Sequence, residues 1–174
     1  MKAINVLSPK FRTEEILESI KECLDKGWTG MGYKTNEFES KWKHYTNLPY
    51  SHFLNSATSG LHLALNLAGT KIKNNFQGVG YSSVHVGNEA DVSIFSFQAV
   101  KNLPTADGGM ICFKNEEDDT KVRKLSWLGI NKDTYSRSTK GSYKWKYDVE
   151  DIGFKYHGNS IMAAMGLVQL KYLD

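Results

Sequence analysis

The residues best suited to chemistry lie in the stretch "FSFQAVKNLPTADGGM", which runs from Phe95 to Met110. A strand-like segment ends at Ser96, Lys101 follows five residues later, and two glycines close the stretch. A lysine that forms a Schiff base must be partly desolvated, so that a fraction of its amine is neutral. The apolar neighbours of Lys101 allow such a place, whereas a solvated loop lysine is the alternative, because most lysines are exposed.

A second stretch, "NSATSG" from Asn55 to Gly60, lies between a strand-like segment and a helical one. Small residues and hydroxyls at the start of a helix leave backbone N–H groups free at its positive dipole end, which suits a phosphate. Capping of the helix by Ser56 or Thr58 is the simpler alternative. Ser96 could face the same phosphate, but a serine at the end of a strand is also a common turn residue.

These stretches must be positioned by elements that alternate between helix and strand. Periodic apolar residues predict a first helix over 13–27, with Ile16, Leu17, Ile20, Cys23 and Leu24 on one face. The last helix, over 159–174, is apolar and shows no C-terminal cap. The alternation favours an α/β fold with a largely parallel sheet. Further helices are expected over 35–47, 57–69 and 117–129, and strands over 51–56, 91–97 and 110–113.

Composition restricts the classes of partner. The chain has 174 residues, enough for one domain or for an incomplete piece of something larger. Its net charge of +3 is mild and its lysines are spread along the chain, so we expect neither a nucleic-acid nor a membrane partner. No apolar run approaches the length that spans a bilayer.

The cysteines and histidines indicate a reduced compartment and no structural metal. Cys23 and Cys112 form no CxxC pair, which favours free thiols over a disulfide. The five histidines lack the spacing of metal ligands. The N-terminal stretch "MKAINVLSPKFRTEE" lacks the apolar segment of a signal peptide, so we expect a cytoplasmic protein.

Three longer stretches carry a family resemblance: "NSATSGLHLAL", "SIFSFQAVKNLPTADGGMICF" and "GFKYHGNSIMAAMGLVQLKYLD". Together they resemble the DegT/DnrJ/StrS family of pyridoxal-phosphate-dependent aminotransferases, which act on keto sugars attached to nucleotides. "GWTGMGYKTNEFESKW" is similar to that family's opening loop and helix. The matches follow the family's order and cover nearly all of the chain. The resemblance implies the large domain of fold type I, a mostly parallel sheet flanked by helices.

The resemblance also implies roles for individual residues. Lys101 falls at the lysine that forms a Schiff base with pyridoxal 5'-phosphate and later moves a proton between the amino donor and the cofactor. Sugar dehydratases of the family have a histidine there, so Lys101 favours amino transfer. Ser96 matches the phosphate-binding serine. Thr58, with the backbone of Ala57 and Ser59, matches the helix start that binds the same phosphate.

Other matched positions differ from the family's usual residues. Gln98 stands where a histidine is common, Lys155 where an asparagine lies near the phosphate, and His157 where an arginine is frequent. Thr29 and Gly30 belong to the opening loop, which lies near the substrate in the family. The resemblance further implies a homodimer with a shared active site, an amino acid donor such as glutamate, and a nucleotide-linked keto sugar as acceptor.

The chain also departs from the family pattern. An internal deletion is expected near 71–85, where the family carries the aspartate that pairs with the pyridine nitrogen and the aromatic residue that stacks on the ring. Glu89, Asp91 and Asp107 do not match that aspartate. Residues 1–174 would then form a partial large domain without the smaller C-terminal domain. Two hypotheses remain, an active sugar aminotransferase and a catalytically impaired relative that binds cofactor or forms a dimer.

Overall fold

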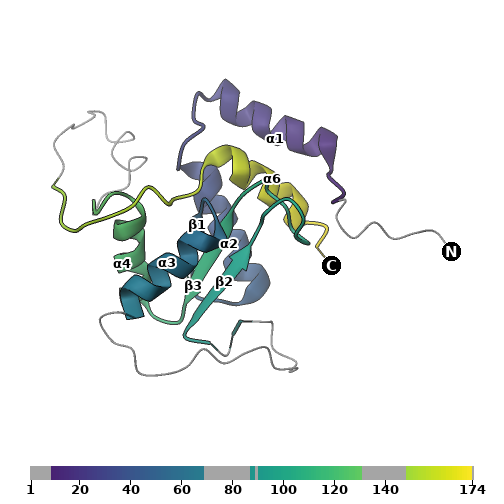
Figure 1. Ribbon diagram of the computed structural model, residues 1–174. Coiled ribbons are helices and arrows are strands. Elements are labelled where there is room, and N and C mark those ends of the chain that lie inside the picture. Colours follow the sequence, from purple (N-terminus) through teal and green to yellow (C-terminus); the bar gives the residue numbers. More distant parts are fainter. Residues whose placement is uncertain (1–8, 69–86, 89, 131–147, 174) are drawn as a thin grey trace.

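The computed structural model describes residues 9–68, 87–88, 90–130 and 148–173. Each helix and strand predicted from the sequence is present within a few residues of its expected bounds. The deletion expected near 71–85 lies outside the described residues. In chain order the elements are α1 (Thr13–Asp25), α2 (Tyr33–Thr46), β1 (Tyr50–Leu54), α3 (Ala57–Ala68), β2 (Val92–Ser96), β3 (Gly109–Phe113), α4 (Glu116–Ser126) and α6 (Ser160–Leu170) (Figure 1).

The described strands form one sheet with the order β1-β3-β2. The α/β class is confirmed, but β3 runs antiparallel to both neighbours, so the expectation of a largely parallel sheet is wrong for these strands. The cause is the connection between β2 and β3. Residues 97–108 contain no helix, and a parallel neighbour would require a long crossover. β1 and β2 are therefore parallel to each other, with β3 reversed between them.

Two apolar clusters fill the two faces of the sheet. Successive strand residues point to opposite faces, so Phe53 joins the cluster beneath α2 and α6 while Leu54 joins the one beneath α3 and α4. Met110 and Ile111 of β3 divide in the same way. The result is a sheet between two helical layers, with α3 and α4 on one side and α2 and α6 on the other (Figure 1).

Helix α1 buries fewer of its apolar side chains than its sequence suggested. On α1, Ile16 and Cys23 are buried, whereas Leu17 and Leu24 are 57% and 59% exposed. Because α1 packs on α6 along a narrow stripe, only part of the expected apolar face is covered. The last helix also ends before the expected bound of 174: Lys171 donates its N–H to Val168 O at 3.2 Å, which closes the final turn. Among the described helices, none combines the length and apolar composition needed to cross a membrane.

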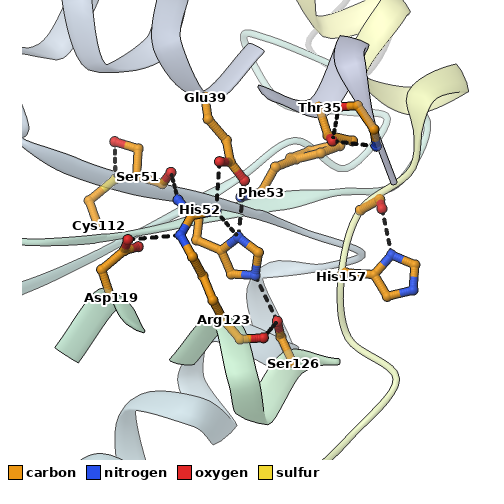
Figure 2. Close-up of polar contacts among 12 residues, drawn as sticks. Thr35, Glu39, Ser51, His52, Phe53, Cys112, Asp119, Arg123, Ser126 and His157 are labelled. Atoms are coloured by element: carbon orange, nitrogen blue, oxygen red, sulfur yellow. Dashed lines mark hydrogen bonds and ion pairs between the residues drawn. The ribbon is translucent and has the colours of Figure 1, made fainter. Parts of the chain in front are cut away.

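Side chains form hydrogen bonds with the outward backbone groups at the outer edge of β1. The N–H of Phe53 donates to Glu39 Oε1 at 2.7 Å, and Arg123 Nη2 donates to Ser51 O at 2.9 Å (Figure 2). Farther along the strand, Gly158 N–H donates to Phe53 O at 2.9 Å. Glu39 and Arg123 thus supply the partners that a neighbouring strand would otherwise provide.

Candidate functional site

The start of α3 is capped and still offers free N–H groups. Ser59 N–H donates to Ser56 Oγ at 3.1 Å, so the capping role suggested for Ser56 is confirmed. The Ser59 hydroxyl donates to Asn55 Oδ1 at 2.6 Å, which leaves it engaged within the turn. Within the described part of the chain, the N–H groups of Ala57 and Thr58 have no acceptor. Thr58 is exposed and is not the cap. The turn therefore keeps donors for an anion at the positive end of the helix.

Gly109 brings this helix start next to Ser96. In the sheet register Ser96 pairs with Gly109, and a methyl group on Gly109 would lie only 2.5 Å from the Ala57 nitrogen. The absence of a side chain on Gly109 thus allows the first residue of α3 to rest against β3. The Ser96 hydroxyl accepts a weak hydrogen bond from Gln98 N–H at 3.5 Å, and its own proton remains available.

Lys101 lies in the loop that follows β2. Phe97 N–H donates to Gly108 O at 2.9 Å and Thr105 N–H donates to Phe97 O at 2.8 Å, so the two ends of the loop are held together. Lys101 N–H donates to Gln98 O at 2.9 Å, closing a turn inside the loop. The lysine itself is exposed, and no ion pair of its ammonium is found among the described residues. The partly desolvated place suggested by its apolar neighbours is therefore not observed; Phe97 and Leu103 are buried instead.

Lys155 reaches the start of α3 through its backbone only. Asn55 Nδ2 donates to Lys155 O at 3.2 Å, which ties the segment after α4 to the turn before α3. The Lys155 ammonium lies 3.4 Å from the centroid of the Trp127 ring, a cation–π contact. Burial lowers the pKa of this amine. The side chain is thus directed to Trp127 and not into the turn.

His157 packs against the same indole. The centroids of the His157 and Trp127 rings are 4.1 Å apart in an edge-to-face arrangement. The Nδ1 atom of His157 lies 2.7 Å from Gly158 O. Burial lowers the pKa of His157 to about 4, so the imidazole is neutral at pH 7. Its Nε2 is buried and has no partner within the described residues. A neutral imidazole differs in charge from the arginine common at this position of the family.

Thr29 and Gly30 lie at a separate place, against the start of α6. Ser160 N–H lies 3.1 Å from Thr29 O and 3.0 Å from Gly30 O, and the Ser160 hydroxyl donates to Gly30 O at 2.6 Å. The opening loop is therefore fixed to α6 by its backbone, and the side chain of Thr29 stays exposed. The structure brings Ala57, at the start of α3, against Gly109, the partner of Ser96 in the sheet, whereas no contact joins Thr29 or Gly30 to them within the described residues.

Asn55 and Gly109 belong to the site, although sequence reasoning did not single them out. Asn55 accepts from the Ser59 hydroxyl and donates to the backbone of Lys155, so it joins two segments far apart in sequence. The available signals were a polar residue directly before the helix cap and the paired glycines after Lys101. Neither pattern indicates which distant segment the residue will contact.

Sequence reasoning also missed a buried polar cluster beneath β1. Glu39 Oε2 and Arg123 Nη1 are 2.9 Å apart, His52 Nδ1 lies 3.0 Å from Glu39 Oε1, and His52 Nε2 lies 2.7 Å from Ser126 Oγ (Figure 2). Burial raises the pKa of Glu39, but Arg123, His52 and the Phe53 N–H outweigh it and lower this pKa to about 2. These contacts fasten α2 and α4 to β1.

The described residues form no metal site, and their main groove lies apart from the candidate residues. No group of three histidine, cysteine or acidic side chains is placed to hold a metal ion in this part of the chain. A groove of about 940 Å³ lies between α1, α2 and α6, and the candidate residues above do not line it. The start of α3 with Ser96 therefore remains the arrangement with the clearest chemistry.

The chain is similar in sequence to several known proteins. SpsC, a spore coat polysaccharide biosynthesis protein of Bacillus subtilis (strain 168), is 43% identical over 95 residues, which are 54% of this chain and 24% of SpsC. A UDP-4-amino-4,6-dideoxy-N-acetyl-beta-L-altrosamine transaminase of Campylobacter jejuni is 37% identical over 97 residues, 56% of this chain and 23% of that protein.

Two further proteins match almost the whole chain. The uncharacterized protein MJ1066 of Methanocaldococcus jannaschii is 26% identical over 249 residues, 94% of this chain and 64% of that protein. The aligned stretch is longer than the 174 residues present here, so MJ1066 carries segments without a counterpart in this chain. A putative sugar aminotransferase, Spr1654 of Streptococcus pneumoniae, superposes with a TM-score of 0.81 at 22% identity, covering 98% of this chain and 68% of that one.

The family itself is identified by a match along most of the sequence. The model of the DegT/DnrJ/EryC1/StrS aminotransferase family matches residues 10–76 and 74–174. The chain spans less than two thirds of each of the three relatives described above. Its fold is shared with Spr1654. The chain therefore belongs to the DegT/DnrJ/EryC1/StrS aminotransferase family.

Proposed function

We propose that this chain forms the cofactor-binding part of a pyridoxal-phosphate-dependent aminotransferase. It would move an amino group from an amino acid, such as glutamate, to a nucleotide-linked keto sugar. One observation carries the proposal: the start of α3 rests against Gly109, directly beside Ser96. Family membership and the name of the Campylobacter jejuni relative, a transaminase of a UDP-linked amino sugar, support the reaction class and the acceptor.

The residues present fit the phosphate end of that cofactor. The unpaired N–H groups of Ala57 and Thr58 and the hydroxyls of Thr58 and Ser96 are donors, and the α3 dipole favours an anion at this place. Ser59 contributes differently from what the family pattern implies. Its N–H is already bonded to Ser56 Oγ and its hydroxyl to Asn55, so Ser59 shapes the turn that presents the other donors.

The loop after β2 would position the amine of Lys101 for the cofactor. Its closed base, Phe97 with Gly108 and Thr105, fixes where Lys101 begins relative to Ser96. Gln98 supports this loop, since its Oε1 accepts Val100 N–H at 3.2 Å. We therefore assign Gln98 to positioning of Lys101.

In the proposed mechanism Lys101 would hold the aldehyde end of the cofactor, and Ser96, Ala57 and Thr58 would hold its phosphate. When bound, pyridoxal phosphate supplies an electron sink for the α-carbon of the amino donor. The Lys101 amine would act as the base and acid that takes a proton from that α-carbon and returns it. The exposed position of Lys101 leaves room for donor and acceptor to approach.

The remaining expected residues receive peripheral roles. Lys155 and His157 both contact Trp127 and would shape the wall beyond the phosphate. Thr29 and Gly30 would contact the sugar nucleotide from the loop fixed to α6. A second copy of the chain would complete the site, as the family resemblance implies.

The covalent link to Lys101 is the first test. The protein is incubated with pyridoxal phosphate, treated with borohydride and examined by absorbance and intact mass. We expect a stable mass increase equal to one reduced cofactor in the wild type, and none in Lys101→Ala. Lys41→Ala, which removes an exposed lysine from α2, serves as the matched control and should behave as the wild type. Equal labelling of Lys101→Ala would contradict the assignment.

A specific observation favours a second candidate, a relative that binds cofactor but turns over poorly. The two family matches meet at residues 74–76, and MJ1066 contains segments that this chain does not have. The family resemblance implies that the acid for the pyridine nitrogen belongs to such a segment. Adding glutamate to the loaded protein separates the candidates. An active aminotransferase releases 2-oxoglutarate in proportion to bound cofactor, whereas the impaired relative retains cofactor and releases none.

A further inference from the structure

The loop between β2 and β3 has a buried base and an exposed tip. The base consists of Phe97, Leu103, Pro104, Thr105 and Gly108, all of them buried. The tip is residues 98–102, in which Lys101 and its neighbours on either side are exposed. Few contacts order an exposed tip, so the place of the Lys101 amine depends on how firmly the base holds the two ends of the loop.

The hydroxyl of Thr105 lies at the centre of this base. Thr105 is fully buried, and its Oγ1 donates to Asp107 O at 2.5 Å, with Phe97 O 3.4 Å away. A methyl group on Gly108 would lie only 2.5 Å from the same Oγ1, so the hydroxyl occupies the space beside that glycine. One buried hydroxyl therefore contacts the backbone at both the start and the end of the loop.

The backbone next to Thr105 is strained. Ala106 has a φ of 70°, in the left-handed region that residues with a Cβ seldom adopt. Such a conformation persists only where the surroundings hold it. The backbone bonds of the base, from Phe97 N–H to Gly108 O and from Thr105 N–H to Phe97 O, do not include Ala106. The bond from the Thr105 hydroxyl to Asp107 O spans this residue and holds it in place.

We infer that the Thr105 hydroxyl is a positioning group for Lys101: by holding Ala106 and the end of the loop, it keeps the tip and its amine in one place. This role deepens the proposed function and rests on it. The amine condenses with the cofactor aldehyde, forming a C=N bond while the aldehyde oxygen leaves as water. Only molecules with the amine in place can do so, so a wandering tip lowers the apparent affinity by the fraction of molecules that are competent.

Two cofactor forms separate this role from a general loss of the site. Pyridoxal 5'-phosphate offers an aldehyde to Lys101, whereas pyridoxine 5'-phosphate has an alcohol there and is held without the covalent link. Fluorescence titration gives the affinity for each, and their ratio is the preference for the aldehyde. We expect the wild type to prefer the aldehyde form and Lys101→Ala to lose that preference.

Thr105→Val removes the hydroxyl and keeps the shape of the side chain. Because Asp107 O then lacks its buried donor, we expect the preference for the aldehyde to fall about tenfold. The affinity for pyridoxine 5'-phosphate should stay within about twofold of the wild type, since that ligand does not use the amine. Thr105→Ser retains the hydroxyl and should restore the preference. If circular dichroism shows Thr105→Val to be unfolded, Thr105→Ala supplies the same comparison.

Thr46→Val is the matched control. Thr46 is 3% exposed and its hydroxyl donates to Trp42 O at 2.8 Å, so the same kind of buried bond is lost at the end of α2 instead of in the loop. This variant should be less stable than the wild type and keep its preference for the aldehyde.

Amide hydrogen exchange examines the loop without cofactor. Lys101 N–H bonds to Gln98 O, and it should exchange about tenfold faster in Thr105→Val than in the wild type or in Thr46→Val.

The outcomes distinguish the positioning role from the proposed function. A wild type with no preference for the aldehyde contradicts the proposed function and the positioning role together. A preference that Lys101→Ala removes and Thr105→Val leaves unchanged overturns the positioning role alone. So does a loss as large in Thr105→Ser or in Thr46→Val as in Thr105→Val, or a Lys101 amide that exchanges at the wild-type rate in Thr105→Val.

Discussion

Gly109 is the residue on which the proposed phosphate site depends most directly. It has no catalytic group, yet it allows Ala57 to rest against β3 beside Ser96. Asn55 secures the same turn from the other side by bonding to Ser59 and to the backbone of Lys155. The donors of the site are therefore held by two residues that would not themselves touch the phosphate.

Replacing Gly109 by alanine should weaken cofactor binding. The new methyl group would lie 2.5 Å from the Ala57 nitrogen and must push the start of α3 away from Ser96. Overpacking of this kind costs about 1–3 kcal/mol, so we expect about a 5- to 140-fold loss of affinity for pyridoxal phosphate. Fluorescence titration measures it. Gly30→Ala is the control, since nothing lies within 4 Å of that position, and it should bind cofactor normally. Unchanged affinity in Gly109→Ala would show that α3 can shift without harm.

At the scale of elements, β1 depends on two helices that supply side chains to its edge. Glu39 of α2 accepts the Phe53 N–H, and Arg123 of α4 donates to Ser51 O while pairing with Glu39. The carboxylate is only 12% exposed, so its charge is stabilised by its partners more than by water. Because α3 follows β1 directly, this anchoring also determines where the phosphate-binding turn begins.

The pKa of Glu39 predicts a specific acid sensitivity. Its value is about 2 in the folded chain against 4.5 for an unperturbed glutamate, so the carboxylate contributes stability above pH 4.5 and loses it as the pH falls toward 2. Glu39→Gln should lower the free energy of unfolding by about 2–3 kcal/mol at pH 7, and the difference from wild type should shrink below pH 4.5. Urea unfolding at several pH values measures this.

A matched control for that experiment lies two positions before Glu39 along α2. Glu37 is 48% exposed and 3.9 Å from Lys34, so it contributes little. Glu37→Gln should therefore follow the wild type at every pH. A constant difference between Glu39→Gln and wild type across the acid range would mean that the Glu39 charge is not what stabilises β1.

At the scale of the whole molecule, the layer of α2 and α6 is held by very close packing. Phe38 of α2 is fully buried among Phe53, Phe97 and Trp42, with ring centroids 5.0 to 6.5 Å apart. Gly166 of α6 lies directly over this ring, since a methyl group there would be 2.6 Å from Phe38 Cζ. The fit of α6 on the core thus requires a residue without a side chain in the middle of a helix.

Gly166→Ala should therefore destabilise the protein although alanine favours helix formation. The gain in helix propensity is about 1 kcal/mol, whereas overpacking against a buried ring costs about 1–3 kcal/mol. We expect a lower midpoint of urea unfolding. Ser40→Ala, on an exposed position of α2, should leave the midpoint unchanged or raise it slightly. A more stable Gly166→Ala would mean that α6 can move away from Phe38 at little cost.

The sequence by itself determined the features that are local. Apolar periodicity located the helices and strands, because each element's own residues carry its pattern. The spacing of Ser96 and Lys101 and the "NSATSG" turn indicated a phosphate and an amine, because these motifs are continuous in the chain. The family followed from the order of such motifs, and the family match confirms it.

Only the tertiary structure decided the features that join distant residues. The reversal of β3, the contact of Gly109 with Ala57 and the pairing of Glu39 with Arg123 depend on which elements become neighbours, and no local pattern records that choice. The same reason explains the exposed leucines of α1 and α3: an apolar stripe predicts burial, but a helix buries only the part that meets a partner. The sequence thus suggested the amine and the hydroxyl, and the packing of α3 on β3 decided that the start of α3 lies against the strand residue that pairs with Ser96.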